Sequence, residues 1–224
     1  TSREGTHNPR WKQPQETSLS RNQNRKNNAM KMKVIDICIK GLTPLLQHRF
    51  GEEAEISGEK ATRTVVRTEE TPREKADKVC YRNKEGEYYM PSTCIHRMLI
   101  EAGSNHKLKG SRKSAKYVVS GAVQMTADSI IIGNGDGKTP AKDYEVDSRP
   151  VVIPSTKGRI MRHRPRFDDW SSNFSLRINE DLLPEDFVHQ LLDEGGLQGG
   201  IGDFRPQKFG PFGTFLVTEW KPQA

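Results

Sequence analysis

Seven glycines fall within residues 195–213, and this segment limits what the chain can fold into more than any other. Glycine is used where the backbone takes a positive φ or passes close to other atoms, so we expect a tight, irregular loop. The stretch before it starts at Pro184, carries apolar residues at helical spacing and is expected to stop at Gly195-Gly196, while residues 214–220 have the pattern of a strand. The loop must therefore join a helix to a final strand.

Hydrophobic periodicity predicts the other elements in the same way. Residues 94–102 are expected to form a helix, because their apolar side chains recur at the spacing of a buried helix face. Ser92 or Thr93 is expected to cap this helix and Gly103 to end it, and a short helix is expected from Pro72. The expected strands are residues 34–39, 81–82, 88–90, 117–125, 128–132, 151–153, 159–164, 174–178 and 214–220.

In chain order the main elements are strand, helix, strand, strand, helix, strand. This order predicts an α+β domain with a ferredoxin-like (βαββαβ) core, the plan that also underlies the RNA recognition motif (RRM-like). We assign residues 33–221 to this domain, with an inserted β-hairpin at residues 133–170 and the glycine-rich loop before the last strand. Since this fold carries many unrelated functions, it does not identify one by itself.

Residues 1–32 are expected to form a disordered basic extension, because they hold almost no apolar side chains to bury. They are either an incidental extension or an arm that touches nucleic acid. Residues 51–72 are charged and show no clear period, so we expect an irregular loop there.

Composition argues against several classes of protein. The cysteines Cys38, Cys80 and Cys94 form no CxxC pair, which argues against a disulfide framework and against a cysteine-based zinc site. No apolar run is long enough to span a membrane, and the first residues are polar rather than signal-like. We expect a cytoplasmic protein that has no membrane partner.

The positive charge of the chain is clustered. The sequence has 36 Lys and Arg against 29 acidic residues, and residues 105–116 and 157–166 hold five Lys or Arg each with no acid. Arg162, Arg164 and Arg166 alternate, so they would share one face of a strand, where guanidinium groups suit phosphate contacts. The alternatives are a charged hairpin edge that discourages aggregation and, for residues 105–116, a solvated surface loop.

The glycine-rich loop also carries side chains that suit nucleic acid. Arg205 and Lys208 add charge, and Phe204, Phe209 and Phe212 offer faces on which bases stack. Free backbone amides in such a loop bind phosphate oxygens. The alternative is a connecting segment whose phenylalanines fill gaps in the core.

Three patches of this sequence resemble the RAMP superfamily of CRISPR-associated proteins, particularly the repeating backbone subunits of effector complexes. They are the first strand with residues 40–45 (KGLTPL), residues 89–99 (YMPSTCIHRML), and the glycine-rich loop before the last strand. Residues 91–93 are Pro-Ser-Thr where the family often has glycine and serine. The resemblance implies binding of single-stranded guide RNA, a homo-oligomer or filament along it, and contacts with other effector subunits. In that family a hairpin "thumb" kinks the RNA, and residues 133–170 are the candidate here.

Together the charge pattern and the resemblance predict a nucleic-acid surface. The expected contacts are Arg49, His96, Arg97, Lys107, Lys109, Arg112, Lys113, Lys116, Lys157, Arg159, Arg162, His163, Arg164, Arg166, Gly200, Gly202, Phe204, Arg205, Lys208 and Phe209. Single-stranded DNA is the alternative ligand, as for an annealing protein of a phage or mobile element.

Catalysis is the remaining alternative. His48 follows the first strand, where some RAMP-type endoribonucleases place a catalytic histidine, so it is the candidate acid or base. A lone histidine is more often structural, and the acidic residues at Asp143, Glu145, Asp147 and Asp168-Asp169 are more often solvated than metal-binding. The sequence has no P-loop, nucleophile elbow or HExxH motif. We therefore expect a non-catalytic binding protein without metal or cofactor.

Overall fold

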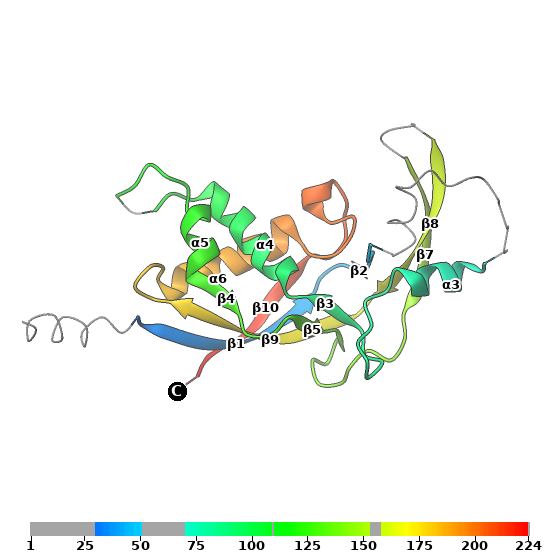
Figure 1. The fold of residues 1–224 in the computed structure, drawn as a ribbon, viewed down its shortest axis with the longest axis horizontal. Coiled ribbons are helices and arrows are strands. Elements are labelled where there is room, and N and C mark those ends of the chain that lie inside the picture. Colours follow the sequence, from blue (N-terminus) through cyan, green and yellow to red (C-terminus); the bar gives the residue numbers. More distant parts are fainter. Residues whose placement is uncertain (1–29, 51–69, 109, 153–157, 224) are drawn as a thin grey trace, which may run out of the picture. The chain divides into compact units, whose positions relative to one another are not determined.

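A computed structural model describes residues 30–50, 70–108, 110–152 and 158–223 (Figure 1). The chain divides into Thr1–Lys31 and Met32–Ala224, and all of the described helices and strands belong to the second unit. Nearly all of the expected extension at 1–32, most of the expected loop at 51–72, and the basic residues Lys109 and Lys157 lie outside the described residues. Within the described ranges, no helix is long and apolar enough to cross a membrane.

The second unit is built around an antiparallel sheet (Figure 1). Ile35, Ile37 and Ile39 are buried on one face of its longest central pairing, because successive side chains of a strand point to opposite faces. The strands, in the order in which they pair, are β10 (Phe215–Pro222), β1 (Met32–Gly41), β9 (Trp170–Asn179) and β4 (Val123–Met125), with β6 (Gly133–Asn134) also on β9.

Helices α4 (Thr93–Ala102), α5 (Lys116–Ala122) and α6 (Glu185–Glu194) cover one face of this sheet (Figure 1). The opposite face carries none of the described helices. Each helix turns an apolar stripe toward the core, as the helical period requires. The buried helical residues are Ile95, Met98, Leu99, Ala102, Val119, Ala122, Val188, Leu191 and Leu192.

A second, smaller sheet has the order β2 (Leu45–Leu46), β8 (Arg159–Phe167), β7 (Glu145–Val152), and α3 (Pro72–Lys78) packs against β7 and β8. We call α3, β2, β7 and β8 the hairpin lobe. The ring of Tyr88 lies 5.6 Å from that of Tyr144 and 5.3 Å from that of Phe167. The pairing of β7 with β8 confirms the predicted hairpin, and these aromatic side chains belong to the same hydrophobic core as the main sheet.

The α+β class and most elements predicted from the sequence are confirmed. The strands expected at 34–39, 174–178 and 214–220 are β1, β9 and β10, and the strand expected at 128–132 is β5 (Ser129–Ile131). The three expected helices are α3, α4 and α6. All of these elements except α3 and β5 are at least eight residues long.

The strand expected at 117–125 is wrong over most of its length. Residues Lys116–Ala122 form helix α5, and only Val123–Met125 is a strand. Adjacent valines favour a strand locally. Here Ala115, Val119 and Ala122 are fully buried at helical spacing, so packing against α4 overrides that preference.

The expected helix ends also differ. Ser92 makes no side-chain capping bond; its own amide donates to the Asp128 carbonyl at 2.8 Å. Gly103 stays right-handed and starts a 3₁₀ turn, Gly103–Asn105. The helix from Pro184 continues past Gly195-Gly196 into a π-helical turn, Gly195–Gly199, and the left-handed break comes at Gly200 with φ of 65°.

The hairpin expected between residues 81–82 and 88–90 is reduced to one bridge, Arg82 with Tyr88. Strand β3 (Tyr89–Pro91) instead pairs with β5. The turn at residues 83–86 does form, since the Gly86 amide donates to the Asn83 carbonyl at 3.1 Å. Strand β3 therefore pairs with β5, which is distant in sequence, rather than with the adjacent segment at residues 81–82.

Candidate nucleic-acid interface

The glycine-rich loop folds back tightly on the rest of the chain. Gly202 has a φ of 80°, and a Cβ added there would lie 2.5 Å from the Leu46 carbonyl oxygen. Gly213 has a φ of 71°, and a Cβ there would overlap the Ile201 carbonyl oxygen. These two positions require glycine on both grounds, conformation and space.

The loop amides are mostly used within the chain. The Ile201 amide donates to the Gly213 carbonyl at 2.9 Å, and the Gly213 amide donates to the Pro44 carbonyl at 2.9 Å. The Asp203 amide donates to the Leu46 carbonyl at 2.8 Å, which joins the loop to β2. The glycines thus serve close packing of the loop, and the expected phosphate cradle of free amides at Gly200 and Gly202 is not its main feature.

The three phenylalanines of the loop have different environments. Phe212 is buried, and Phe204 is half-buried with its ring 6.0 Å from that of Phe212. The guanidinium of Arg149 lies 4.6 Å from the Phe212 ring. Phe209, by contrast, is 98% exposed and has a left-handed backbone with φ of 59°. Of the three, Phe209 is the one placed for contact with a ligand.

Helix α4 and the loop together enclose a hollow of about 500 Å³. The Arg205 guanidinium is fixed at its edge, where Nη1 donates to the Gly202 carbonyl at 2.9 Å and Nη2 donates to Gln207 at 2.8 Å. Arg97 is 72% exposed and donates to Glu101 at 3.0 Å. The residues that line the hollow are Thr93, Cys94, His96, Arg97, Ile100, Ile201, Gly202 and Arg205.

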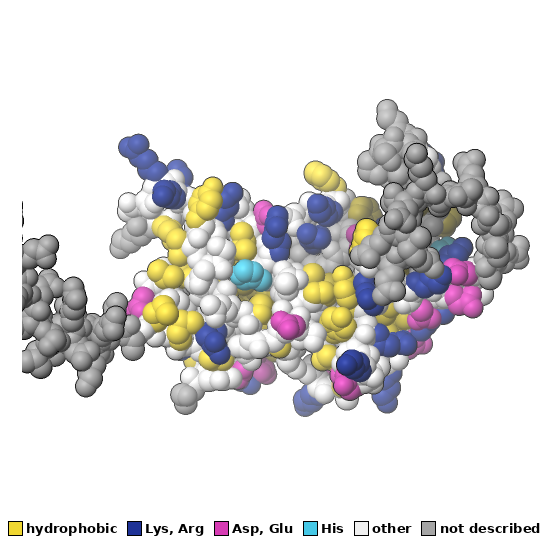
Figure 2. Space-filling view, viewed as in Figure 1, with side chains coloured by type: hydrophobic (Ala, Val, Ile, Leu, Met, Phe, Trp, Pro, Cys, Tyr) yellow, Lys and Arg dark blue, Asp and Glu magenta, His cyan; other side chains and the backbone are white. Residues whose placement is uncertain are grey.

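The hollow brings together four of the residues predicted to bind nucleic acid, from two segments far apart in sequence: His96 and Arg97 from α4, and Gly202 and Arg205 from the loop. Lys208, also predicted, is exposed on the 3₁₀ turn Pro206–Lys208 that follows Arg205. Figure 2 shows Lys and Arg side chains gathered over α4 and over this loop.

A second basic group lies between the 3₁₀ turn Gly103–Asn105 and α5. Lys107, Arg112 and Lys113 are exposed, and Lys116 is half-buried. Sequence reasoning missed Tyr117, which is 67% exposed with the Lys116 ammonium 5.1 Å from its ring centre. The signal was present in its position next to the basic segment, but the strand assignment hid it.

The arginines of β8 are held in pairs. Arg164 is buried, 8% exposed, and its Nε lies 2.8 Å from Oδ2 of Asp203, which joins the hairpin lobe to the loop. Arg166 donates to Asp168 at 2.6 Å. Arg162, Arg164 and Arg166 alternate along β8 as predicted, but each already has a partner within the chain, and Arg164 is enclosed by the packing of lobe and loop.

His48 lies in the same cluster. Arg162 Nη1 donates to His48 Nε2 at 2.9 Å. Because a guanidinium has no acceptor, Nε2 is unprotonated in this arrangement and Nδ1 carries the proton. Burial lowers the pKa of His48, and the charges of Arg164 and Arg162 lower the pKa further, whereas Asp203 opposes them. The nitrogen that a catalytic base would use is thus occupied.

The remaining predicted contacts are dispersed. Arg49 is exposed beyond β2, with its amide bonded to the Val79 carbonyl at 2.7 Å. Arg159 is exposed at the start of β8, and His163 Nδ1 lies 2.7 Å from Ser148 Oγ. None of the three lines the hollow between α4 and the loop.

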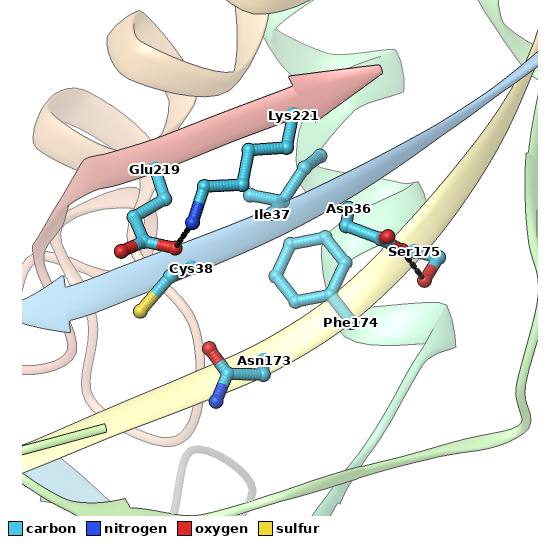
Figure 3. A pocket seen from close by; sticks show the side chains of 8 residues that line it. All are labelled: Asp36, Ile37, Cys38, Asn173, Phe174, Ser175, Glu219 and Lys221. Carbon is cyan, nitrogen blue, oxygen red and sulfur yellow. Dashed lines mark hydrogen bonds and ion pairs between the residues drawn. The ribbon is translucent and has the colours of Figure 1, made fainter. Parts of the chain in front are cut away.

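The open face of the main sheet has a different character (Figure 3). A shallow depression of about 430 Å³ lies over β1, β9 and β10. Asp36 accepts hydrogen bonds from Ser175 at 2.5 Å and from Gln223 at 2.9 Å, which lower its pKa. Lys221 pairs with Glu219 at 2.6 Å. Phe174 lines this depression but is buried, so the face offers mutually paired polar groups rather than exposed rings.

Three of the acidic residues considered as metal ligands, Asp143, Asp147 and Asp168, pair with arginines. Asp143 pairs with Arg73, and Asp147 pairs with Arg149. Across the described ranges, no three His, Cys, Asp or Glu side chains come together in a way that could hold a metal ion. These carboxylates brace the hairpin lobe.

Comparisons with known proteins give a likeness in structure. No protein-family model and no curated protein matches the sequence. A chain in the cryo-EM structure of the Type III-B Cmr-beta bound to cognate target RNA matches with a TM-score of 0.54 at 11% identity, over 92% of this chain and 64% of that chain. Cmr6 from Pyrococcus furiosus matches with a TM-score of 0.42 at 11% identity, over 84% of this chain and 98% of that one, which is too distant to carry an argument.

This chain thus spans about 64% of the length of the Cmr-beta chain that it matches. At 11% identity the likeness concerns the fold alone. The chain therefore shares its fold with that chain of the Type III-B Cmr-beta complex.

Proposed function

We propose that this protein is a single-stranded-RNA-binding backbone subunit of a CRISPR-type ribonucleoprotein and that copies of it assemble along a guide RNA. One observation carries the proposal: α4 and the glycine-rich loop converge on a basic hollow on the helix side of a RAMP-like fold. The Cmr-beta complex that contains the matching chain is itself bound to target RNA, which supports the same class of ligand here.

The proposed core is ferredoxin-like. The sheet order β10-β1-β9-β4, with α4 between β1 and β4 and α6 between β9 and β10, supports this assignment. The RNA site differs from that of an RNA recognition motif, whose sheet carries exposed aromatic rings. The paired polar residues on the open face of this sheet favour the helix side as the binding surface.

The features of the helix side suit a single strand. Proteins that bind single strands combine a basic groove for the backbone with aromatic side chains on which bases stack. Arg97, Arg205 and Lys208 supply the charge, and exposed Phe209 supplies a ring. Single-stranded DNA would meet the same groups, so contacts with the 2′-hydroxyl decide between the two ligands.

The hairpin lobe is the proposed thumb. Val152 and Met161, near the free end of β7 and β8, are 57% and 56% exposed, and Arg159 lies beside them. Exposed apolar side chains next to an arginine suit insertion between bases and contact with the flanking phosphate. The structure does not favour RNA cleavage by His48, because His48 Nε2 already accepts a hydrogen bond from Arg162.

The test of RNA binding removes charge from one face at a time. Arg97→Gln, Arg205→Gln and Lys208→Gln together should weaken binding to an unstructured RNA oligonucleotide and reduce the slope of log K against log salt by about 2, since each phosphate contact on a single strand contributes roughly 0.7. Fluorescence anisotropy over a salt series measures both quantities, and a DNA oligonucleotide of the same sequence tests the preference for RNA.

The matched control removes equal charge from the open face, with Lys40→Gln, Arg177→Gln and Lys221→Gln. These variants should leave the slope unchanged. If both triple variants lose the same affinity and the same salt slope, the helix side is not the binding face. Absence of RNA binding by the unmodified protein would overturn the proposed function itself.

A further inference from the structure

The hollow between α4 and the glycine-rich loop has a floor that differs from its rim. Of its apolar lining residues, Ile201 is buried and Cys94 and Ile100 are half-buried, whereas Arg97 is 72% exposed. Burial raises the pKa of the Cys94 thiol, which agrees with a poorly solvated floor. A hollow lined only for phosphate would not need this apolar surface, because phosphate contacts are polar and charged.

The size and chemistry of the hollow fit a flat heterocycle. Its volume of about 500 Å³ lies within the range of roughly 300–1,000 Å³ that small-molecule sites occupy. The apolar floor suits a ring, and Thr93 and His96 offer hydrogen-bonding groups for the edge of that ring. Arg205 is held by Gly202 and Gln207, so its planar group has a fixed orientation for stacking.

Phe209 lies four residues beyond Arg205, and it is exposed beside this hollow-forming segment. An apolar ring that is 98% exposed on a left-handed residue gains nothing from the folded chain. It is, however, free to stack on a base. The loop therefore offers two sites for aromatic rings: the hollow, and the exposed ring of Phe209.

We propose that this hollow takes one nucleobase, splayed out of the bound strand, while Phe209 stacks on a neighbouring base. The inference rests on the proposed function, and it adds a contact with a base to the contacts with the backbone. Sites for unstacked bases that combine ring stacking with hydrogen bonds at the base edge are the usual way in which proteins read single-stranded RNA.

Abasic scanning tests the hollow directly. A uridine-rich RNA oligonucleotide is replaced, one position at a time, by an abasic ribose that keeps the phosphate charge. The unmodified protein should lose affinity by about 5- to 150-fold, the range expected for a lost base contact, at two neighbouring positions of each footprint, one for the hollow and one for Phe209. Phe209→Ser should give a smaller penalty at a neighbouring position, because its stacking partner is gone.

A variant that fills the hollow gives the second measurement. Thr93 is exposed at the start of α4, so Thr93→Trp places a ring in the hollow without disturbing the core. This variant should bind intact RNA more weakly and show no penalty at the position assigned to the hollow, while the position that Phe209→Ser affects stays sensitive. Ser120→Trp, on the exposed side of α5, is the control and should behave like the unmodified protein.

The outcomes separate the two proposals. RNA binding with equal affinity for every abasic oligonucleotide would overturn the base site and leave the proposed function intact. Persistence of both sensitive positions in Thr93→Trp would place the base at another site and also overturn the inference. If the protein binds no RNA at all, both the proposed function and the base site are overturned.

Discussion

At the scale of single residues, identical side chains in one loop have different roles. Phe204 and Phe212 pack with Arg149 at the boundary of the hairpin lobe, whereas Phe209 is exposed. Composition alone left core filling and base contact equally open for all three, and the structure buries Phe212, half-buries Phe204 and leaves Phe209 exposed. The deciding factor is whether the hairpin lobe covers the side chain.

His48 should make stability depend on pH in a defined direction. Its pKa in the folded protein is below the ordinary value of 6.5, mainly because burial disfavours the imidazolium. The unfolded chain therefore binds the proton more readily, so the free energy of unfolding should fall as the pH drops below about 6.5. Above that pH this contribution to stability is fully present.

The measurement is urea unfolding of the unmodified protein and of His48→Gln between about pH 7.5 and 5, a range above most carboxylate titrations. Gln offers an acceptor for Arg162 but does not titrate, so its stability should fall less on acidification. His189→Gln, which changes a histidine on α6, is the matched control. Indistinguishable pH profiles for His48→Gln and the unmodified protein would contradict the assignment.

At the scale of elements, one ion pair joins the hairpin lobe to the glycine-rich loop. Arg164 of β8 is 8% exposed and Asp203 of the loop is 33% exposed. Among the described residues, Arg164 Nε and Nη1 are buried and have no well-aligned hydrogen bond. Arg164 Nε lies 2.8 Å from the Asp203 carboxylate, but the geometry is poor for a hydrogen bond. Charge attraction rather than directional hydrogen bonding therefore holds the two elements together.

Removing one partner of this pair should be costly. Asp203→Ala leaves a buried guanidinium uncompensated and should lower the free energy of unfolding by about 3 kcal/mol, the low end of the range for one-sided removal, because Asp203 is one-third exposed. Adding Arg164→Met should recover much of this loss. Chemical denaturation of the two single variants and the double variant measures the coupling.

Lys221→Met provides a surface comparison, since its pair with Glu219 is exposed and should contribute little to stability. A coupling between Arg164 and Asp203 no larger than that of an exposed pair would mean that the lobe and the loop are joined by packing alone. Arg164 would then be free for another partner.

At the scale of the whole folded unit, the two faces of the main sheet differ in chemistry. The helix side carries the hollow and the basic loop at residues 105–116, and the open side carries paired polar groups. Figure 1 shows that loop and the hairpin lobe at opposite ends of the helix layer. A strand that follows the helix side would therefore meet basic groups at both ends and the hollow between them.

Such a layout predicts assembly along an RNA. Oligonucleotides of one, two and three footprint lengths should bind one, two and three copies, because neighbouring copies would occupy successive stretches of the strand. Sedimentation velocity at saturating protein counts the copies. A single copy on every length would contradict the repeating-subunit proposal without affecting the RNA site.

Local sequence was sufficient to predict the period of each long element, the clustering of basic residues and the position of the glycine-rich loop. Ile35, Ile37 and Ile39 alternate in any context that buries one face of a strand, so their spacing alone indicates the strand. The short elements were less determined, and at residues 117–125 packing against α4 overrode a local strand preference.

The availability of charged and aromatic groups to a ligand, by contrast, was settled by tertiary packing. Arg97 and Arg164 look alike in sequence, yet one is 72% exposed at a hollow and the other is enclosed beside Asp203. Exposure depends on contacts between segments far apart in the chain, such as the loop on β2 and on β8. A local pattern encodes the period of an element, but it does not encode which other segment will cover it.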